Sequence, residues 1–336
     1  LGIKFNSFSN FFNVIQNLKG NNFSLDENSC SEYFEKLISS KFEIIYKKDP
    51  CYLFKSIKNK TEITNTIKSH IKDGVALTKF LYWIKNQKKN VSEITAEKKL
   101  EKFRKRNKEY LYPSFKTIAG SGPNSAIIHY SANKKSNRIL SKDNLFLIDS
   151  GGQYKYGTTD VTRTICFNKP IKKIKNIYTR VLKSHISVVN FKLKNNSDGS
   201  QIDKVARKNL KDFNLDYPHG TGHGVGYFLN VHEGPQSISK KNKVILKEGM
   251  IVSNEPGFYM KNKFGIRIEN LIYIKKIKNK LKFENLTFVP IEKDLINFDL
   301  LNNSEKNYLK NYHSLVFKKL RKFLNKNEVI WLKNLI

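Results

Sequence analysis

Glycine and histidine alternate in one short segment, and this segment limits the fold more than any other part of the chain. It reads His219-Gly-Thr-Gly-His223-Gly-Val-Gly and is followed by Val231-His232-Glu-Gly-Pro235. Four glycines between positions 219 and 227 exclude a regular helix, so these histidines cannot form a helical HExxH metal site. Glycine also allows the backbone to approach a bound group closely. We therefore expect this segment to lie outside the helices and next to a bound group.

Acidic residues gather in three other short segments that also contain glycine. The segments are Asp149-Ser-Gly-Gly-Gln-Tyr-Lys-Tyr-Gly-Thr-Thr-Asp160, Asn254-Glu255-Pro-Gly-Phe-Tyr259 and Phe264-Gly-Ile-Arg-Ile-Glu269-Asn270. Asp149 and Asp160 flank a glycine-containing turn that could fold both carboxylates onto one point. Strand alternation puts Arg267 and Glu269 on one face of the third segment, with isoleucines on the other face.

Two Asp, two Glu and one His form an oxygen-rich set of candidate metal ligands: Asp149, Asp160, His223, Glu255 and Glu269. Hard divalent ions such as Mn²⁺ suit this set, while a thiolate-bound structural zinc is excluded because no cysteine lies near these segments. Five protein ligands are too many for one open catalytic ion. They suit two ions that share bridging carboxylates, about 3.5–4 Å apart, which together turn bound water into hydroxide near neutral pH.

The rest of the chain predicts helices around a largely antiparallel sheet, in an α/β or α+β domain. Helices are expected from an N-cap at Thr61, after Thr95, over about 171–194 and 200–213, and from an N-cap at Ser304 to about 324. Strands are expected at 144–148, 161–167, 249–254 and 266–274. Residues 1–55 resemble the remnant of an α/β unit, with a short apolar run at 42–46. We interpret His70, His185 and His313 as ordinary helix residues outside the site.

The formal net charge of +33 raises the question of an anionic partner. The lysines are spread along the whole chain, and asparagine and isoleucine are abundant with them, as AT-rich coding produces without selection for binding. We therefore expect a solvated basic surface and no nucleic-acid partner. No apolar run approaches the roughly 20 residues that span a bilayer, so we expect no membrane segment.

The cysteines and the start of the chain bear on compartment. Cys30, Cys51 and Cys166 are widely separated, and their odd number does not indicate a disulfide framework. We expect reduced thiols in a cytoplasmic protein. The chain begins with Leu and shows no signal peptide, so we expect a fragment, or a protein whose own N-terminus has been removed.

Five motifs together resemble a known family. They are Ser121-Gly-Pro-Asn-Ser-Ala-Ile-Ile-His129-Tyr, DSGGQY with GTTDVTRT, HGTGHGVG with LNVHEGP, NEPGFY and FGIRIEN. Their order and spacing, from about residue 56 to the C-terminus, resemble the long, multidomain Xaa-Pro aminopeptidases (aminopeptidase P) of the pita-bread metallopeptidases. The resemblance implies an α+β fold with a curved, mainly antiparallel sheet covered by helices. It also implies hydrolysis of the bond between an N-terminal residue and a following proline, by a hydroxide that bridges two divalent ions.

The resemblance also implies a role for each candidate ligand. Asp149 would bind one ion, and Asp160 and Glu269 would bridge both ions. His223 and Glu255 would complete the shell of the second ion, and Glu255 would also accept a proton from the bridging water. Mn²⁺ is the first choice, although Co²⁺ and Zn²⁺ also tolerate such ligands.

Four further positions match residues that do not bind metal in the family. His129 and His232 match histidines that hold the substrate and stabilise the transition state. His219 and Arg267 match positions that support the ligands or contact the substrate. Tyr259 is a weaker candidate for contact with the substrate. A proline amide nitrogen carries no hydrogen, so a dedicated pocket is needed for such substrates.

The same resemblance predicts three parts of the chain and a dimer. Residues 1–55 would be the tail of a second N-terminal domain, 56–290 the catalytic domain, and 291–336 a C-terminal extension. Because this extension often contributes to a homodimer in the long-type family, we expect a homodimer.

Two alternatives remain open. A prolidase or methionine aminopeptidase would share the fold, but these relatives carry different residues around the second histidine, where this chain has LNVHEGP. A catalytically inactive binding module would suit the basic charge, since some pita-bread proteins bind nucleic acid or histones. Such proteins typically lose metal ligands, whereas all five candidates are present here.

Overall fold

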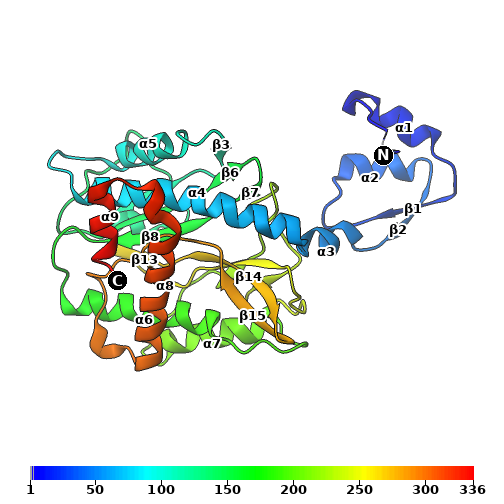
Figure 1. Cartoon of the computed structure of the whole chain (residues 1–336). Helices are drawn as coiled ribbons and strands as arrows, with labels where there is room; N and C mark the ends of the chain where they lie inside the picture. The colour runs from blue at the N-terminus through cyan, green and yellow to red at the C-terminus, as the bar shows by residue number, and fades with distance from the viewer. Residues whose placement is uncertain (1, 3) are drawn as a thin grey trace. The chain divides into compact units, whose positions relative to one another are not determined.

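The computed structural model describes residue 2 and residues 4–336, in two compact units that divide between Phe54 and Lys55 (Figure 1). The N-terminal unit is a small α/β piece whose two strands run parallel, with a helix between them. Ile15, Ile38 and Phe42 form its buried centre. Its elements are η1 (Phe8–Asn10), α1 (Phe11–Asn17), β1 (Asn22–Leu25), α2 (Glu32–Ser39) and β2 (Glu43–Tyr46), and α3 (Pro50–Ser56) follows.

The larger unit opens with the long helix α4 (Lys60–Lys85). Its N-cap is Asn59, whereas the sequence analysis predicted Thr61. The Asn59 side chain accepts a hydrogen bond from the backbone N–H of Glu62, and the Glu62 carboxylate accepts one from the backbone N–H of Asn59. This reciprocal capping box satisfies two backbone donors, which a threonine inside the first turn cannot do.

For two further helices, the start expected from the sequence also lies two or three residues after the observed start. Helix α5 (Glu93–Arg104) is capped by Ser92 instead of beginning after Thr95. Helix α8 (Asn303–Leu320) is capped by Asn302 instead of Ser304, again through a capping box. In each case several polar residues precede the helix, and only the backbone conformation selects the one that accepts the hydrogen bond.

The described strands of the larger unit pair in antiparallel fashion, which confirms the expected α+β class with a mainly antiparallel sheet. The pairing divides into short sheets, ordered β4-β5-β8, β3-β6-β7, β11-β14-β15, β12-β13 and β10-β9. The strands are β3 (Tyr110–Pro113), β4 (Ile118–Ser121), β5 (Phe146–Ser150), β6 (Gly152–Tyr154), β7 (Gly157–Thr158), β8 (Val161–Ile165), β9 (Gly222–His223), β10 (Ser237–Ile238), β11 (Ile251–Asn254), β12 (Gly257–Met260), β13 (Phe264–Arg267), β14 (Asn270–Ile277) and β15 (Lys280–Asn285). The strand expected at 266–274 is therefore interrupted at Ile268 and Glu269.

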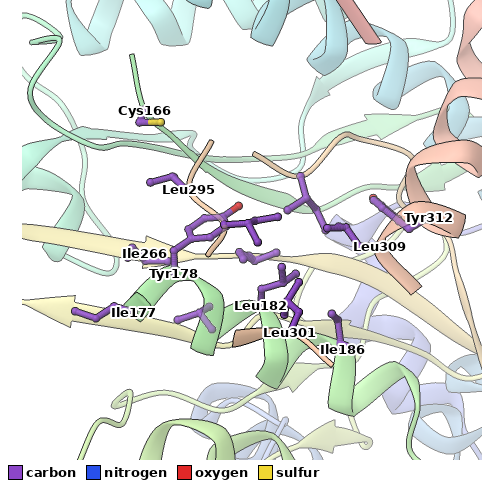
Figure 2. Packing of buried hydrophobic residues seen from close by; sticks show 14 of the residues in the cluster. Cys166, Ile177, Tyr178, Leu182, Ile186, Ile266, Leu295, Leu301, Leu309 and Tyr312 are labelled. Carbon is purple, nitrogen blue, oxygen red and sulfur yellow. The ribbon is translucent and has the colours of Figure 1, made fainter. Parts of the chain in front are cut away.

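Helices cover the sheets and complete the core. These helices are α6 (Lys172–Val189), α7 (Gly199–Lys211), α8 and α9 (Lys326–Lys333), with short 3-10 turns η2 (Gly122–Ala126), η3 (Phe298–Leu300) and η4 (Arg321–Phe323). Figure 2 shows Leu182 of α6 next to Leu301, and Leu309 and Ile266 belong to the same buried cluster. The apolar stripe of α6 thus buries against the last part of the chain, as helical spacing predicts.

Polar groups in the core connect the helices to the strands that carry the acidic motifs. The guanidinium of Arg104 in α5 donates to the carboxylate of Asp73 in α4 at 2.7 Å and to the hydroxyl of Ser150 at 3.1 Å. The hydroxyl of Tyr154 donates to the same carboxylate at 2.9 Å. Because a buried ion pair of this kind is costly to break, it holds β5 and β6 in place against the helices.

The three helix histidines are buried, as expected of ordinary helix residues. Burial lowers the pKa of His185 to about 3 and the pKa of His313 to about 4. No described helix is long and apolar enough to cross a membrane, and no disulfide joins the described cysteines.

Candidate metal centre

Five elements bring the predicted ligands to one place. Asp149 is in β5, Asp160 directly precedes β8, His223 is in β9, Glu255 directly follows β11, and Glu269 directly precedes β14. The Nε2 atom of His223 lies 3.4 Å from Oδ2 of Asp160 and 3.4 Å from Oε1 of Glu255.

The candidate ligand atoms form three overlapping groups. In each group the ligand-type atoms lie within 4.8 Å of one another: Asp149, Asp160 and Glu269; His223, Glu255 and Glu269; Asp160, His223 and His232. All five residues that the sequence suggested as ligands are thus neighbours, although more than 100 residues separate the first from the last.

Some oxygens of the buried carboxylates in this centre lack hydrogen-bond partners. Asp149, Asp160 and Glu269 are 7%, 3% and 2% exposed. The Oδ1 atoms of Asp149 and Asp160 have no hydrogen-bond partner in the described chain. Burial raises the pKa of Asp160 and of Glu269 well above the usual range, and the neighbouring carboxylates raise both further. Divalent cations would remove this repulsion and use the free oxygens, so the residues fit a two-ion site.

His223 presents the ring nitrogen that a metal requires. Its Nδ1 atom lies 2.9 Å from the carbonyl oxygen of Gly224, so Nδ1 carries the proton and donates it there. The lone pair is therefore on Nε2, which faces Asp160 and Glu255. A backbone carbonyl that selects the tautomer in this way is common behind metal-binding histidines.

Two hydroxyl groups support the acids. Ser253 accepts a hydrogen bond from the backbone N–H of His223 and donates one to Glu255, each at 2.9 Å. Thr162 donates to Glu269 at 2.7 Å. Sequence reasoning did not select either residue, because hydroxyl side chains are frequent and only their position against the acids distinguishes them. The available signal in the sequence was that Ser253 lies two residues before Glu255 and Thr162 lies two residues after Asp160.

Arg267 supports an acid and makes three hydrogen bonds in the site. Its guanidinium donates to Asp149 Oδ2 at 2.5 Å, to the hydroxyl of Tyr259 at 2.6 Å and to the hydroxyl of Thr162 at 3.2 Å. Nε2 of His219 lies 2.9 Å from the Tyr259 hydroxyl, and Nδ1 of His219 lies 4.0 Å from Glu255. Burial raises the pKa of Tyr259 to about 12. These contacts fit a supporting role for Arg267 and His219, and Arg267 also lines the cavity above the acids.

The acids form the floor of a cavity of about 320 Å³. His129, which lies in the loop after η2, and His232 are exposed and line this cavity, whereas His219 is not among the lining residues. The ring of His232 lies edge-on to the ring of His223, with 4.1 Å between centroids. Phe115, Ile128 and Val231 add an apolar wall that the sequence did not identify, since nothing local marks these residues as facing a site.

A second group of ligand-type side chains lies apart from this cavity. It consists of Cys166, Glu292 and Asp294. The ammonium of Lys85 donates to Glu292 at 2.6 Å and to Asp294 at 3.1 Å, so a cation is already supplied by the chain. Burial raises the pKa of the Cys166 thiol to about 12, which disfavours the thiolate that metals bind.

Comparison with known proteins agrees with this arrangement. Residues 65–276 match metallopeptidase family M24, and residues 279–335 match the C-terminal region of the same peptidases. A Laccaria bicolor protein named Probable Xaa-Pro aminopeptidase P is 44% identical over 291 residues, 82% of this chain and 45% of its own length. Xaa-Pro aminopeptidase 1 of Dictyostelium discoideum is 38% identical over 356 residues. This alignment covers 100% of this chain and 56% of the Dictyostelium protein.

A solved structure extends the comparison to the fold. An X-prolyl aminopeptidase from Caenorhabditis elegans, a cytosolic enzyme with a di-nuclear active site, superposes with a TM-score of 0.84 at 36% identity. The match covers 87% of this chain and 50% of that one, and it confirms the expected pita-bread fold. The chain thus spans about half the length of each of these three relatives. With the family's sequence pattern over most of its length and the acids of the motifs gathered in one cavity, the chain belongs to metallopeptidase family M24.

Proposed function

We propose that this chain is a two-metal aminopeptidase that hydrolyses the bond between an N-terminal residue and a following proline. The observation that carries the proposal is the overlap of three groups of donor atoms on the floor of one cavity. The substrate class is supported by relatives of 38% and 44% identity that are named Xaa-Pro aminopeptidases.

Five residues would hold two divalent ions. Asp149 would bind one ion, Asp160 and Glu269 would bridge, and His223 and Glu255 would complete the second shell. Mn²⁺ is our first choice because the ligand set is rich in oxygen, with Co²⁺ and Zn²⁺ as alternatives. When bound, the ions would supply a hydroxide near neutral pH and polarise the scissile carbonyl. The di-nuclear site of the C. elegans enzyme supports the number of ions.

The chain's own residues would move protons and orient the peptide. Glu255 would accept a proton on the oxygen that Ser253 leaves free, since Ser253 donates to Oε1. Burial, and then the neighbouring His223, lower the pKa of His232. The ring of His232 is therefore neutral at pH 7 and can donate one N–H to the carbonyl of the scissile bond. His129 would hold the peptide from another side of the cavity.

Two features of the cavity suit a short peptide with proline at its second position. The carboxylates on the floor would attract the free amine of the first residue. The apolar side chains of Phe115, Ile128 and Val231 offer a wall for a pyrrolidine ring, which has no amide hydrogen to satisfy. We also propose that residues 1–55 are the tail of a preceding domain, 56–290 the catalytic domain and 291–336 its extension, in a cytoplasmic homodimer.

The first experiment measures release of the N-terminal residue from the tripeptide Arg-Pro-Pro. Metal-stripped protein is compared with and without Mn²⁺, beside Asp160→Ala and the control Asp143→Ala, whose carboxylate is exposed and outside the cavity. Mn²⁺ should restore activity to the wild type and the control, and the Asp160 variant should lose at least a hundredfold in kcat.

Other outcomes would separate the alternatives. Faster cleavage of the dipeptide Arg-Pro than of the tripeptide would indicate a prolidase-like specificity. Metal binding without cleavage of either peptide would remove the aminopeptidase proposal for this chain. Neither cleavage nor metal binding would favour a non-enzymatic binding module with a basic surface.

A further inference from the structure

The carboxylate next to His232 is buried and has no role in the site described so far. Glu233 follows His232 in the chain, yet His232 is exposed in the cavity whereas Glu233 is 5% exposed. Neither carboxylate oxygen of Glu233 has a hydrogen-bond partner in the described chain. A desolvated carboxylate without hydrogen bonds is costly, so its position requires a compensating charge.

Two lysines supply that charge. Nζ of Lys55 lies 3.4 Å from Oε2 of Glu233, and Nζ of Lys58 lies 3.7 Å from Oε1. The side chain of Lys55 is 33% exposed, whereas the side chain of Lys58 is fully buried. Burial lowers the pKa of Lys58, and the charge of Glu233 opposes that shift. Without Glu233 the buried ammonium of Lys58 would keep only its hydrogen bond to the carbonyl of Ser56 at 3.3 Å, and without Lys58 the buried carboxylate would keep only the partly exposed Lys55. Lys58 and Glu233 therefore depend on each other more than Lys55 and Glu233 do.

Lys58 is itself attached firmly to a strand that leads to the metal centre. Its backbone N–H donates to the carbonyl of Gly249 at 3.0 Å, and Ile57 forms an isolated bridge with Met250. Gly249 has a φ of +86°, and a Cβ atom there would lie 2.5 Å from the carbonyl oxygen of Lys58. The glycine therefore permits this close packing. Residues 57 and 58 are joined in this way to the start of β11, the strand that ends next to Glu255.

The loop that carries His232 is also attached by hydrogen bonds to its backbone. The backbone N–H of Glu233 donates to the carbonyl of Gly224 at 2.9 Å. Earlier in the loop, the side chains of Gln153 and Thr158 donate to the carbonyl of Leu229 at 2.7 and 3.1 Å, and the backbone N–H of Gly226 donates to the carbonyl of Asn230 at 2.9 Å. Within the part of the chain that is described, no hydrogen bond holds the His232 ring. The direction of that ring therefore depends on how the backbone of residues 232 and 233 is held.

We propose that the buried pair of Lys58 and Glu233 is a positioning device that holds the loop so that His232 faces the cavity. The pair ties the loop to residues 249 and 250, which lead directly into β11, the strand that ends next to Glu255. His232 and Glu255 would thereby keep a fixed position relative to each other. The inference rests on the proposed function, because it assigns His232 a place against the scissile carbonyl. Neither Lys58 nor Glu233 lines the cavity, so both are positioning residues.

The test uses the full chain loaded with Mn²⁺ and the tripeptide Arg-Pro-Pro. The variants are Lys58→Met, Glu233→Gln, Lys58→Arg and the double variant K58M/E233Q, with Lys60→Met as a control that removes an exposed lysine at the start of α4. Kinetics give kcat and KM, elemental analysis gives bound Mn²⁺, and thermal unfolding gives stability. Histidine ring signals in NMR, assigned with His232→Gln, report on the loop without any turnover.

We expect each single loss of charge to lower kcat at least tenfold, with KM within about twofold and bound Mn²⁺ unchanged. Lys58→Arg should keep most of kcat, because arginine retains the positive charge beside Glu233. The double variant should regain thermal stability relative to the single variants but not kcat, since no unpaired charge remains and the loop is still released. The His232 signal should shift in Lys58→Met and Glu233→Gln, and the control should match the wild type.

Three results would overturn the inference. The first is a fall in kcat that only follows the loss of folded protein or of bound Mn²⁺. The second is recovery of kcat in the double variant. The third is an unchanged His232 signal in both single variants. A wild-type chain that binds Mn²⁺ but cleaves no peptide would instead remove the proposed function, and the NMR comparison would still decide whether the pair positions the loop.

Discussion

At the scale of single residues, the centre places acids where they cannot all be ionised without added cations. Asp160 lies among Asp149, Glu255 and Glu269 and is 3% exposed. Thr162 and Arg267 satisfy one oxygen each of Glu269 and Asp149, and no hydrogen bond reaches Oδ1 of Asp149 or of Asp160. The free energy of the metal-free fold therefore depends on whether these carboxyls keep their protons.

A pH prediction follows from the raised pKa of Asp160. A carboxyl whose folded pKa exceeds its ordinary value of 3.8 contributes stability that is fully present below that value. The contribution is lost as pH rises through the folded pKa, because the folded chain must then hold the charge. Metal-stripped Asp160→Asn should therefore unfold at a higher temperature than metal-stripped wild type at pH 8, and the difference should shrink toward pH 4.5.

The measurement is thermal unfolding of both proteins in chelator across this pH range. Asp143→Asn serves as the control, because its carboxylate is exposed. The buried His185 and His313 are present in both proteins, so their own pH dependence cancels in the difference. A difference that does not change with pH would contradict the assignment. Added Mn²⁺ should raise the unfolding temperature of the wild type and not that of the variant.

At the scale of elements, the site depends on short strands that pack so closely that one position has no room for a side chain. Strand β9 carries His223 and lies against β11 through a bridge between Gly224 and Val252. A Cβ atom on Gly222 would overlap the carbonyl oxygen of Ser253, the residue that holds both His223 and Glu255. The absence of a side chain at position 222 is thus a condition for the metal centre.

Two neighbouring glycines should therefore respond differently to the same substitution. Gly222→Ala should push β9 from β11, lower the affinity for Mn²⁺ at least tenfold and destabilise the fold by about 1–3 kcal/mol. Gly220→Ala should change stability by no more than about 0.5 kcal/mol, because a Cβ there would meet its nearest atom at 3.4 Å. Calorimetric titration with Mn²⁺ and thermal unfolding test both variants. Equal effects at the two positions would contradict the packing argument.

At the scale of the whole molecule, one buried arginine joins the C-terminal region to the metal centre. The guanidinium of Arg163 donates to the carbonyls of Glu269, Val289 and Pro290 at 2.6, 2.8 and 2.9 Å, and it lies 3.0 Å from the Tyr312 hydroxyl in α8. The C-terminal region is thus part of the folded unit that presents Glu269, in agreement with a single compact unit from Lys55 to Ile336.

The proposed homodimer is tested at the same scale. In the C-terminal region Phe323 and Ile330 are 46% and 51% exposed, although both are large and apolar. We expect light scattering at micromolar concentration to give a mass of about twice the 39.1 kDa of one chain. Ile330→Asp should shift the protein toward the monomer, because a charge would enter an apolar contact, whereas Lys326→Asp at an exposed site should not. A monomeric wild type at this concentration would contradict the dimer.

The chemistry of the candidate site follows from residue types and their local spacing. Asp149, Asp160, His223, Glu255 and Glu269 were identifiable as candidate ligands because acids, histidines and glycines occur together in short segments. The order of predicted helices and strands indicated a largely antiparallel sheet but left α/β and α+β open, and the resemblance of the motifs to a known family selected α+β. Helix starts were predictable only to within two or three residues, because Asn59 and Thr61 are both good caps and only the backbone selects one.

Contacts between distant segments required the folded structure. No local pattern shows that Ser253 and Thr162 hold the acids, that Arg267 is engaged with Asp149, or that His219 is absent from the cavity wall. The burial of Glu233 beside Lys58 was equally invisible, since the two are 175 positions apart. The sequence determines the type of each side chain, but the packing of the whole chain determines its neighbours and its exposure to water. Neighbours and exposure in turn set the charge, the proton affinity and the orientation of each side chain at the site.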